Sequence, residues 1–370
     1  MFKEMVTVLD FGSSRITALV GMKDVNKSFK LLASSESEYD GYANGEFVDA
    51  NNLKNVIESV LKDIESQLHC KLRNIYIGVP AEFCFCYNAT LNTVFNKKVK
   101  ITPKIIDNLF YEDKEYNPYP SHTVINKAPL FYILNDDNKT NDPVGQFASK
   151  IQANVSYVLV ENNFKMLVSG ILDEYGIKDY DFISNTLAEA IYLIDDTKRN
   201  EGAILIDCGY ISSSITQVLG DGLKELKSFS MGGAFITSDL AKVFDLDFED
   251  AESLKRQAIV TLRPSGVDCY ETDAGKKVGI RTANEVILAR VDNIINIIKK
   301  CIDSFEVQLP KYIPLYLTGG GLNYIEGISD YLRHEFDRPV EFVAPKALLY
   351  RKPDLSSSIS LLNMAINLFK

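Results

Sequence analysis

One pattern occurs twice in this chain, and it constrains the fold more than any other feature. The segment Ala203–Thr216 contains a short apolar run, Asp207 at its end, Gly209, a run of serines and a second apolar stretch. The apolar run is typical of an interior strand, and glycine permits a turn with positive φ. N–H groups and hydroxyls in such a turn converge on one point, which suits a phosphate with its metal ion. The segment therefore predicts a phosphate-binding hairpin.

The same plan is present near the N-terminus. Residues 6–20 form an apolar strand, a polar turn and a second strand. The polar positions of this turn are Asp10, Gly12, Ser13 and Ser14. Two such hairpins about 200 residues apart predict two similar half-domains that face one ligand.

A third glycine-rich element also follows a strand. Leu317–Leu322 contains three consecutive glycines, where a flat group could lie against bare backbone. Elsewhere, residues 51–69 have apolar positions at helical spacing and 75–79 form an apolar run. Alternation of strands and helices predicts an α/β sheet with crossover helices.

Length and composition exclude several classes of protein. The 370 residues suffice for two domains or one large bilobed unit. A net charge of −10 argues against general nucleic-acid binding and against adhesion to anionic lipid. No apolar run approaches the roughly 18–20 residues that cross a bilayer, and the N-terminus leaves no room for a signal peptide. The six cysteines and three histidines show no metal spacing. We therefore expect a cytoplasmic protein with buried free thiols and no nucleic-acid partner.

Residues 81–160 interrupt the alternation of strands and helices. We expect strands at 83–95, 124–134 and 149–160, and a helix from Thr102-Pro103 to about Phe110, with proline in its first turn. This composition predicts a self-contained insert.

The ordered motifs resemble those of the actin-like ATPase superfamily, and several of them narrow the resemblance to the FtsA family of bacterial cell-division proteins. The segment Asn141-Asp-Pro-Val-Gly145 is similar to an element of the inserted FtsA subdomain 1C. Similar family segments match residues 41–49, 230–239, 250–255 and 317–327. The resemblance covers nearly the whole chain from about Val6.

This resemblance implies a bilobed, actin-like α/β fold, in which a duplicated ribonuclease-H-like unit carries an inserted α+β subdomain. Subdomain 1A would comprise residues 1–80 and 163–200, and the 1C insert residues 81–162. Subdomain 2A would comprise residues 201–236 and 306–370, including a closing helix, and subdomain 2B residues 237–305.

The resemblance also implies that ATP and Mg²⁺ bind in the cleft between the lobes. Asp10 and Asp207 would hold the metal through water. The phosphates would contact Gly12, Ser13, Ser14, Arg15, Gly209, Ser212 and Ser213. Gly232 and Gly233 would let backbone approach the β-phosphate or ribose, and Gly319, Gly320 and Gly321 would form a shelf for adenine. Glu252 and Lys255 match the pair that contacts ribose and adenine; the alternative is a surface ion pair between residues one helical turn apart.

Three positions depart from the superfamily pattern. Ile211 replaces a glycine beside the phosphate, and a β-branched residue resists positive φ. Ser214 replaces an acidic residue. Asn185 stands where related proteins often have Glu, and an amide can orient the attacking water but cannot take its proton. Glu189 could compensate, although we expect it on a helix surface. Weak or absent hydrolysis follows from this pattern, and enzymatic activity is left open.

The segment Ile359–Lys370 has apolar residues all around the predicted helix. An interfacial anchor needs a distinct basic face, whereas an all-round apolar helix is typical of a core. FtsA proteins usually continue through a linker to an amphipathic membrane helix. We expect a core helix here and no direct membrane attachment by this segment.

The first functional interpretation is an FtsA-like cytoskeletal protein of cell division. It would self-associate into filaments or dimers, receive the tail peptide of the tubulin homologue FtsZ at subdomain 2B, and contact other division or envelope proteins through the insert. Its place would be cytoplasmic, at the division site through these partners. The alternative is a PilM-like adaptor of a pilus or secretion platform with a degenerate nucleotide site. A small-molecule kinase is the third and least favoured interpretation.

Overall fold

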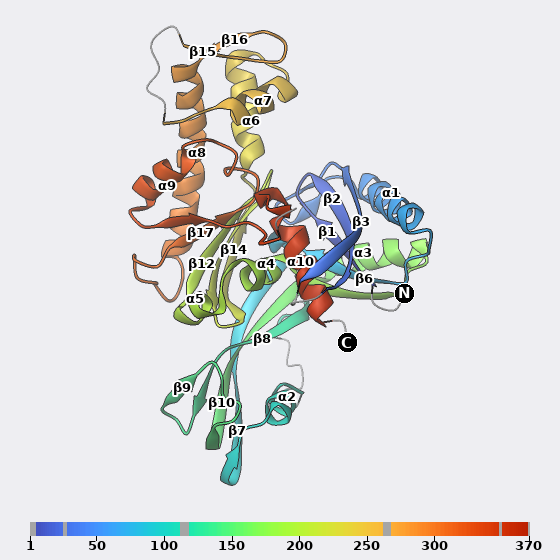
Figure 1. Ribbon diagram of the computed structural model, residues 1–370, viewed down its shortest axis with the longest axis vertical. Coiled ribbons are helices and arrows are strands. Elements are labelled where there is room, and N and C mark those ends of the chain that lie inside the picture. The colour runs from blue at the N-terminus through green and yellow to red at the C-terminus, as the bar shows by residue number, and fades with distance from the viewer. Residues whose placement is uncertain (1–4, 25–27, 112–117, 262–267, 348–349, 369–370) are drawn as a thin grey trace.

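Two five-stranded sheets with the same topology form the body of the molecule. The computed structural model describes residues 5–24, 28–111, 118–261, 268–347 and 350–368 (Figure 1). The predicted C-terminal segment therefore has its last two residues outside the described part.

The first sheet has the strand order β11-β6-β1-β2-β3. Strands β1 (Met5–Phe11), β2 (Arg15–Lys23) and β3 (Phe29–Glu38) form an antiparallel meander. Strands β6 (Asn74–Val79) and β11 (Asp179–Ser184) continue the sheet parallel to β1. Helices α1 (Ala50–Leu68) and α3 (Asn162–Tyr175) contribute to one core with these strands. The Asp49 carboxylate caps α1 by accepting from two N–H groups of its first turn.

The second sheet repeats this order as β14-β13-β12-β17-β18. Strands β12 (Ala203–Cys208), β13 (Ser213–Leu219) and β14 (Gly222–Phe229) form the meander. Strands β17 (Leu315–Thr318) and β18 (Val340–Phe342) lie parallel to β12. The β1–β2 and β12–β13 hairpins thus occupy equivalent places, which confirms the two similar half-domains predicted from the sequence.

Helices pack on the second sheet and extend beyond it. Its core contains side chains of α6 (Gly233–Phe244), α7 (Phe248–Gln257), α8 (Ile280–Asp303) and α9 (Ile328–Phe336). A small hairpin of β15 (Cys269–Glu271) and β16 (Lys277–Gly279) lies beside α7 and α8 (Figure 1). Three further short elements lie on connections: the paired strands β4 (Tyr42–Ala43) and β5 (Glu46–Phe47), and helix α5 (Asp196–Glu201).

The insert forms a sheet of its own and projects away from both lobes (Figure 1). Its order is β7-β10-β8-β9, built from β7 (Cys84–Lys100), β8 (His122–Leu134), β9 (Asn138–Thr140) and β10 (Phe147–Glu161). With helix α2 (Pro103–Tyr111) it has a separate core. The three long strands β7, β8 and β10 extend beyond their predicted bounds, and β7 does so through mostly polar residues that continue its pairing with β10. At the base, the Ser156 hydroxyl donates to Leu223 O of the second lobe at 2.7 Å.

The final helix, α10 (Ser356–Leu368), packs mainly against the first sheet. Its Ser356 hydroxyl also accepts a hydrogen bond from Thr318 Oγ1 of β17 at 2.6 Å. Ile359, Leu361 and Leu362 are buried against Val6 and Val8 of β1 and against α4 (Asn185–Leu193). The expected core helix is confirmed. The predicted span 306–370 therefore crosses from the second lobe back to the first. Among the described residues, no helix combines the length and apolar character needed to cross a membrane.

Candidate functional site

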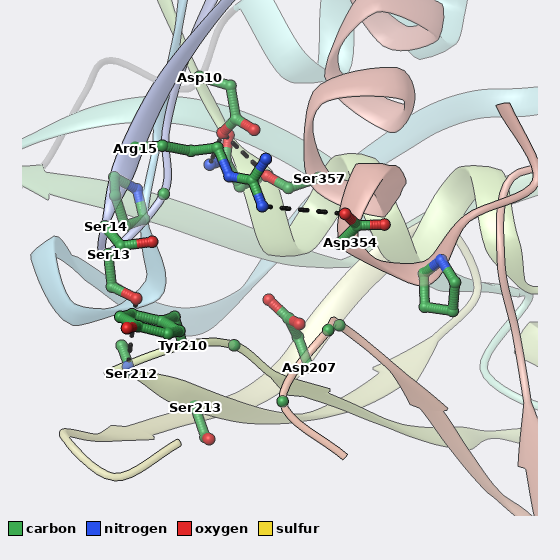
Figure 2. Close-up of a pocket in the computed structure, with 18 of the residues that line it drawn as sticks. Asp10, Ser13, Ser14, Arg15, Asp207, Tyr210, Ser212, Ser213, Asp354 and Ser357 are labelled. Carbon is green, nitrogen blue, oxygen red and sulfur yellow. Dashed lines mark hydrogen bonds and ion pairs between the residues drawn. The ribbon is translucent and has the colours of Figure 1, made fainter. Parts of the chain in front are cut away.

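The two hairpins face each other across a cleft between the lobes (Figure 2). The cleft is also lined by the start of α4, the glycine turn after β17, part of α7 and the segment that leads into α10. Of the residues predicted from the sequence, all except Gly232 and Gly233 line it.

The hairpin turns are closed by matching hydrogen bonds. Gly12 N–H donates to Arg15 O at 2.9 Å, and Gly209 N–H donates to Ser212 O at 3.0 Å. A Cβ atom at Gly12 or Gly209 would lie 3.0 or 2.8 Å from those same oxygens. Gly209 does not have the positive φ that we expected from its place in the turn. The reason for glycine is instead the close approach of backbone across the turn.

The hairpins also contact each other directly. The Ser13 hydroxyl accepts hydrogen bonds from Ile211 N–H at 2.9 Å and from Ser212 N–H at 3.4 Å (Figure 2). Ile211 is not among the residues with positive φ, so its β-branched side chain causes no strain here. The N–H groups expected to meet phosphate are therefore engaged by a hydroxyl of the opposite lobe.

Three carboxyl groups line the buried part of the cleft. Burial raises the pKa of Asp10 to about 6, although hydrogen bonds from Ser357 Oγ (2.9 Å) and Asn185 Nδ2 (2.7 Å) oppose the rise. Burial and then the charge of Asp10 raise the pKa of Asp207 to about 7. The pKa of Glu189 is raised well above its usual range by burial, then by Asp207 and Asp10. Glu189 is 2 % exposed, so its expected place on the helix surface is wrong.

These three carboxyl groups in one cleft favour the binding of a cation. Asp10 and Glu189 are buried and Asp207 is half-buried, so the three carboxyl groups do not all ionise readily without positive charge beside them. Mg²⁺ prefers carboxylates, phosphates and its own waters as ligands. Within the described residues, no group of three His, Cys, Asp or Glu side chains is arranged to hold a metal directly. Asp10 and Asp207 are the residues of this cleft that could hold a hydrated ion through water.

Glycine residues let the second hairpin, the start of α6 and the turn after β17 pack backbone against backbone. A Cβ at Gly232 would lie 2.4 Å from Gly209 O, and one at Gly233 would lie 2.7 Å from Gly321 Cα. Gly233 N–H donates to Gly209 O at 2.9 Å, and Gly321 N–H donates to Cys208 O at 2.7 Å. Gly232 and Gly233 therefore join the second hairpin to α6 and to the turn after β17. Gly319, with φ of +86°, forms that turn.

Glu252 and Lys255 form a buried network, so the alternative of a surface ion pair is wrong. Lys255 is 3 % exposed, and its ammonium group donates to Glu252 Oε2 (2.6 Å), Thr237 Oγ1 (3.0 Å) and Gly233 O (3.2 Å). These contacts use all three of its donors. Burial lowers the pKa of Lys255, against the opposing charge of Glu252. Glu252 and Lys255 thus join α7 to the start of α6 and also line the cleft.

The mouth of the cleft carries a chain of contacts that sequence reasoning missed. Arg15 lies 3.2 Å from Glu36 and 3.8 Å from Asp354 (Figure 2). Asp354 accepts from the Tyr324 hydroxyl at 2.6 Å, and the Arg256 guanidinium lies 5.4 Å from the Tyr324 ring centroid. Ser357, which donates to Asp10, was missed as well. No motif marked Asp354 or Ser357, because they meet the first hairpin only where the chain returns to the first lobe with α10.

Comparison with known proteins accords with this geometry. A family model described as cell division protein FtsA matches residues 204–360. Curated proteins named cell division protein FtsA match nearly the whole chain. That of Staphylococcus epidermidis is 21 % identical, covering 97 % of this chain and 78 % of its own. That of Enterococcus hirae is 24 % identical (98 % and 84 %) and that of Escherichia coli K12 is 22 % identical (93 % and 84 %).

The chain is similar to FtsA cell-division proteins over nearly its whole length. Solved structures show the same fold. The PilM–PilN type IV pilus biogenesis complex contains a chain with a TM-score of 0.64 and 16 % identity, and coverage is 98 % of both chains. MreB5 of Spiroplasma citri bound to ADP has a TM-score of 0.57 and 10 % identity, covering 97 % of this FtsA-like chain and 95 % of its own. The predicted actin-like α/β fold is confirmed.

Proposed function

We propose that this FtsA-like protein binds Mg-ATP in the cleft between its lobes and uses the nucleotide as a conformational ligand in cell division. The observation that carries the proposal is the pair of equivalent hairpins, which bring the buried Asp10 and the half-buried Asp207 into one acidic cleft. The solved neighbours with ADP or AMPPNP bound support a nucleotide ligand in this fold.

The residues have distinct roles in this proposal. Asp10 and Asp207 hold Mg²⁺ through its waters, and the ion neutralises the phosphates and the carboxylates. The backbone and hydroxyls of the two hairpins bind phosphate. For this, the hydrogen bonds from the Ile211 and Ser212 N–H groups to the Ser13 hydroxyl must break. Arg15 and Arg256 stand at the mouth of the cleft, where guanidinium groups attract the polyphosphate. Gly319–Gly321 and Glu252 remain the proposed contacts for adenine and ribose.

Hydrolysis is slow or absent in this proposal. Asn185 donates to Asp10 and has no basic group to take a proton from water. Nucleotide then acts by shifting the population of lobe arrangements. Self-association, with the insert as one contact surface, and linkage of an FtsZ-type polymer to other division proteins complete the function. The names of the curated relatives support this part of the proposal.

A second function has specific support. The similarity to the chain of the PilM–PilN complex extends over 98 % of both chains, and Ser13 occupies the N–H groups of the second hairpin. A PilM-like adaptor, in which the cleft stays closed and the insert or lobe surface binds a partner, fits both observations.

Binding of Mg-ATP separates the two functions. We would measure the thermal melt of the wild type and of Asp10→Ala with millimolar Mg-ATP, with Mg-GTP as the control ligand. A ligand at a hundred times its dissociation constant stabilises a protein by about 2.7 kcal/mol. A rise in Tm of the wild type alone supports the nucleotide switch. Equal melting curves with and without ATP would leave the adaptor as the better account.

A further inference from the structure

The insert is joined to the first lobe along the chain but is docked on the second lobe in space. Strand β7 comes after β6, and β10 is followed by α3, so both ends of the insert continue into the first lobe. Near these ends, however, its strands contact β14 of the second lobe. Ser156 of β10 is 0 % exposed, and its hydroxyl donates to Leu223 O at 2.7 Å and accepts from Leu223 N–H at 3.2 Å. On β7, Asn88 Nδ2 donates to Lys224 O at 2.8 Å.

The turn between β13 and β14 fits closely against β8 of the insert. Asp221 N–H donates to Pro129 O at 3.0 Å. Gly220 has a φ of +57°, and a Cβ atom there would lie 2.2 Å from Leu130 O. A Cβ atom at Gly222 would lie 2.9 Å from Leu130 Cδ2. The turn is therefore in direct backbone contact with β8, and a shift of the second lobe must either move β8 or break this contact.

The side chain of Arg199 holds the same turn against the end of α4. It is buried, with 6 % of the residue exposed. Its Nε atom donates to Gly220 O at 3.0 Å, and Nη2 donates to Asp221 Oδ1 at 2.7 Å. Its Nη1 atom donates to Ile194 O at 2.5 Å and to Ile191 O at 3.3 Å. Because these acceptors belong to two elements, one planar guanidinium group joins the turn to α4.

Helix α4 extends from this contact to the cleft. It has nine residues, which span about 13 Å. At its first residue, Asn185 Nδ2 donates to Asp10 Oδ1 in the cleft at 2.7 Å. One apolar cluster contains Val158 of the insert, Leu187 of α4 and Val218 of the second lobe. The insert and the two lobes thus share one core around α4.

We propose that docking of the insert on the second lobe is coupled to closure of the two hairpins, with the β13–β14 turn, Arg199 and α4 as the link. In the closed arrangement the Ser13 hydroxyl accepts from Ile211 N–H. Packed cores and interfaces change between discrete arrangements and do not deform gradually, so the two contacts form or break together. Such coupling is reciprocal. A ligand in the cleft then changes the insert, and a partner bound to the insert changes the cleft, in the nucleotide switch and in the adaptor alike.

Amide hydrogen exchange of the full chain without ligand tests the direction from the cleft to the insert. Ser13→Ala removes the acceptor between the hairpins, and Ser14→Ala is the matched control. Loss of one hydrogen bond changes an opening equilibrium by about 2- to 12-fold. We expect Ser13→Ala to raise exchange by such a factor in β8 and in residues 219–224. Exchange in Ser14→Ala should equal that of the wild type.

The reverse direction uses a contact at the exposed edge of the insert, where a substitution does not endanger folding. Asn88→Ala removes the hydrogen bond to Lys224 O. Asn92→Ala is the matched control, because Asn92 lies on the same side of β7 four residues further along and is also exposed. We expect Asn88→Ala to raise exchange at residues 211–212, in the contact between the hairpins. Asn92→Ala should leave exchange there unchanged.

Arg199→Lys tests the link itself. Lysine keeps the positive charge but lacks the planar group that reaches both the turn and α4. In this background the effect of Ser13→Ala should be confined to the hairpins. If Arg199→Lys does not fold, the comparison of Asn88→Ala with Asn92→Ala decides alone.

Exchange that rises only beside each substitution would overturn the inference. A rise of the same size in α9, which packs on α8 and β18, would also overturn it, because the effect would then be a general loss of stability. Neither result involves nucleotide. The inference and the proposed binding of Mg-ATP therefore succeed or fail separately.

Discussion

The hydroxyl of Ser13 accepts a hydrogen bond from the backbone N–H of Ile211, which lies 198 residues further along the chain. One short side chain thus joins the turn of the first hairpin to the turn of the second. In the structure this contact occupies the N–H groups that a phosphate would use. The lobes are held together at the point where the proposed ligand must enter.

Substitution Ser13→Ala should loosen this contact between the lobes. A neutral hydrogen bond contributes about 0.5–1.5 kcal/mol, so the loss in the free energy of unfolding should fall in that range. Ser14→Ala is the matched control, because the Ser14 contact to Tyr39 uses its backbone oxygen. Chemical denaturation and the rate of limited proteolysis between the lobes would measure the effect. A Ser13→Ala protein as stable as Ser14→Ala would contradict the role of the hydroxyl.

The stability of the protein without nucleotide should fall as pH rises from 5 to 8. The pKa of Asp207 is raised by burial and Asp10 to about 7, against 3.8 as its ordinary value. Between these values the folded state holds a proton that the unfolded state has released, so the free energy of unfolding decreases with pH. Asp10, with its pKa raised to about 6, acts in the same direction.

Melting curves at several pH values, with wild type beside Asp207→Asn, check this expectation. The variant should melt higher than wild type at pH 8 and show a weaker dependence on pH. Mg²⁺ with ATP should reduce the fall in the wild type. A wild-type Tm that rises steadily from pH 5 to 8 would show that the carboxyl groups ionise without penalty.

Substitution Lys255→Met should destabilise the contact between α6 and α7. It removes three hydrogen bonds and leaves the partly buried Glu252 with fewer donors. Breaking one partner of a buried ion pair costs about 3–5 kcal/mol, and the partial exposure of Glu252 places the expected loss at or below the lower end. Arg256→Ala, on the exposed side of the same carboxylate, should cost about 1 kcal/mol or less. Thermal melting compares the two, and equal losses would contradict a buried anchor.

Two glycine-to-alanine substitutions should have opposite effects. At Gly233 a Cβ would lie 2.7 Å from Gly321 Cα and from Gly321 O, so backbone must move and we expect large destabilisation or loss of soluble protein. At Gly170, inside α3, nothing lies within 4 Å of a Cβ, and φ is not positive. Alanine there should stabilise the helix by up to about 1 kcal/mol. Expression level and Tm of both variants are the measurements; a tolerated Gly233→Ala would disprove the tight backbone packing.

The sequence predicted what is local and periodic. The repeated hairpin around Asp10 and Asp207, the helix at 51–69 and the insert were expected because strand length, turn residues and helical spacing are short-range signals. The burial of Glu189 and Lys255 was missed, since one sequence does not show which face of a short helix meets a cleft. Ser357 and Asp354 were missed for a different reason. Their contact with the first hairpin depends on where α10 packs, and that is decided by its apolar face and not by any motif.

The hydrogen bond from Ser357 to Asp10 implies an order in which the parts of the cleft form during synthesis. Ser357 lies 347 residues after Asp10, so the ribosome adds it much later. The first hairpin can fold early, but one of the two donors to its carboxylate arrives only with α10. A nascent chain therefore lacks the complete cleft until α10 has emerged and packed on the first sheet. Nucleotide binding would then report that the chain has folded as far as α10.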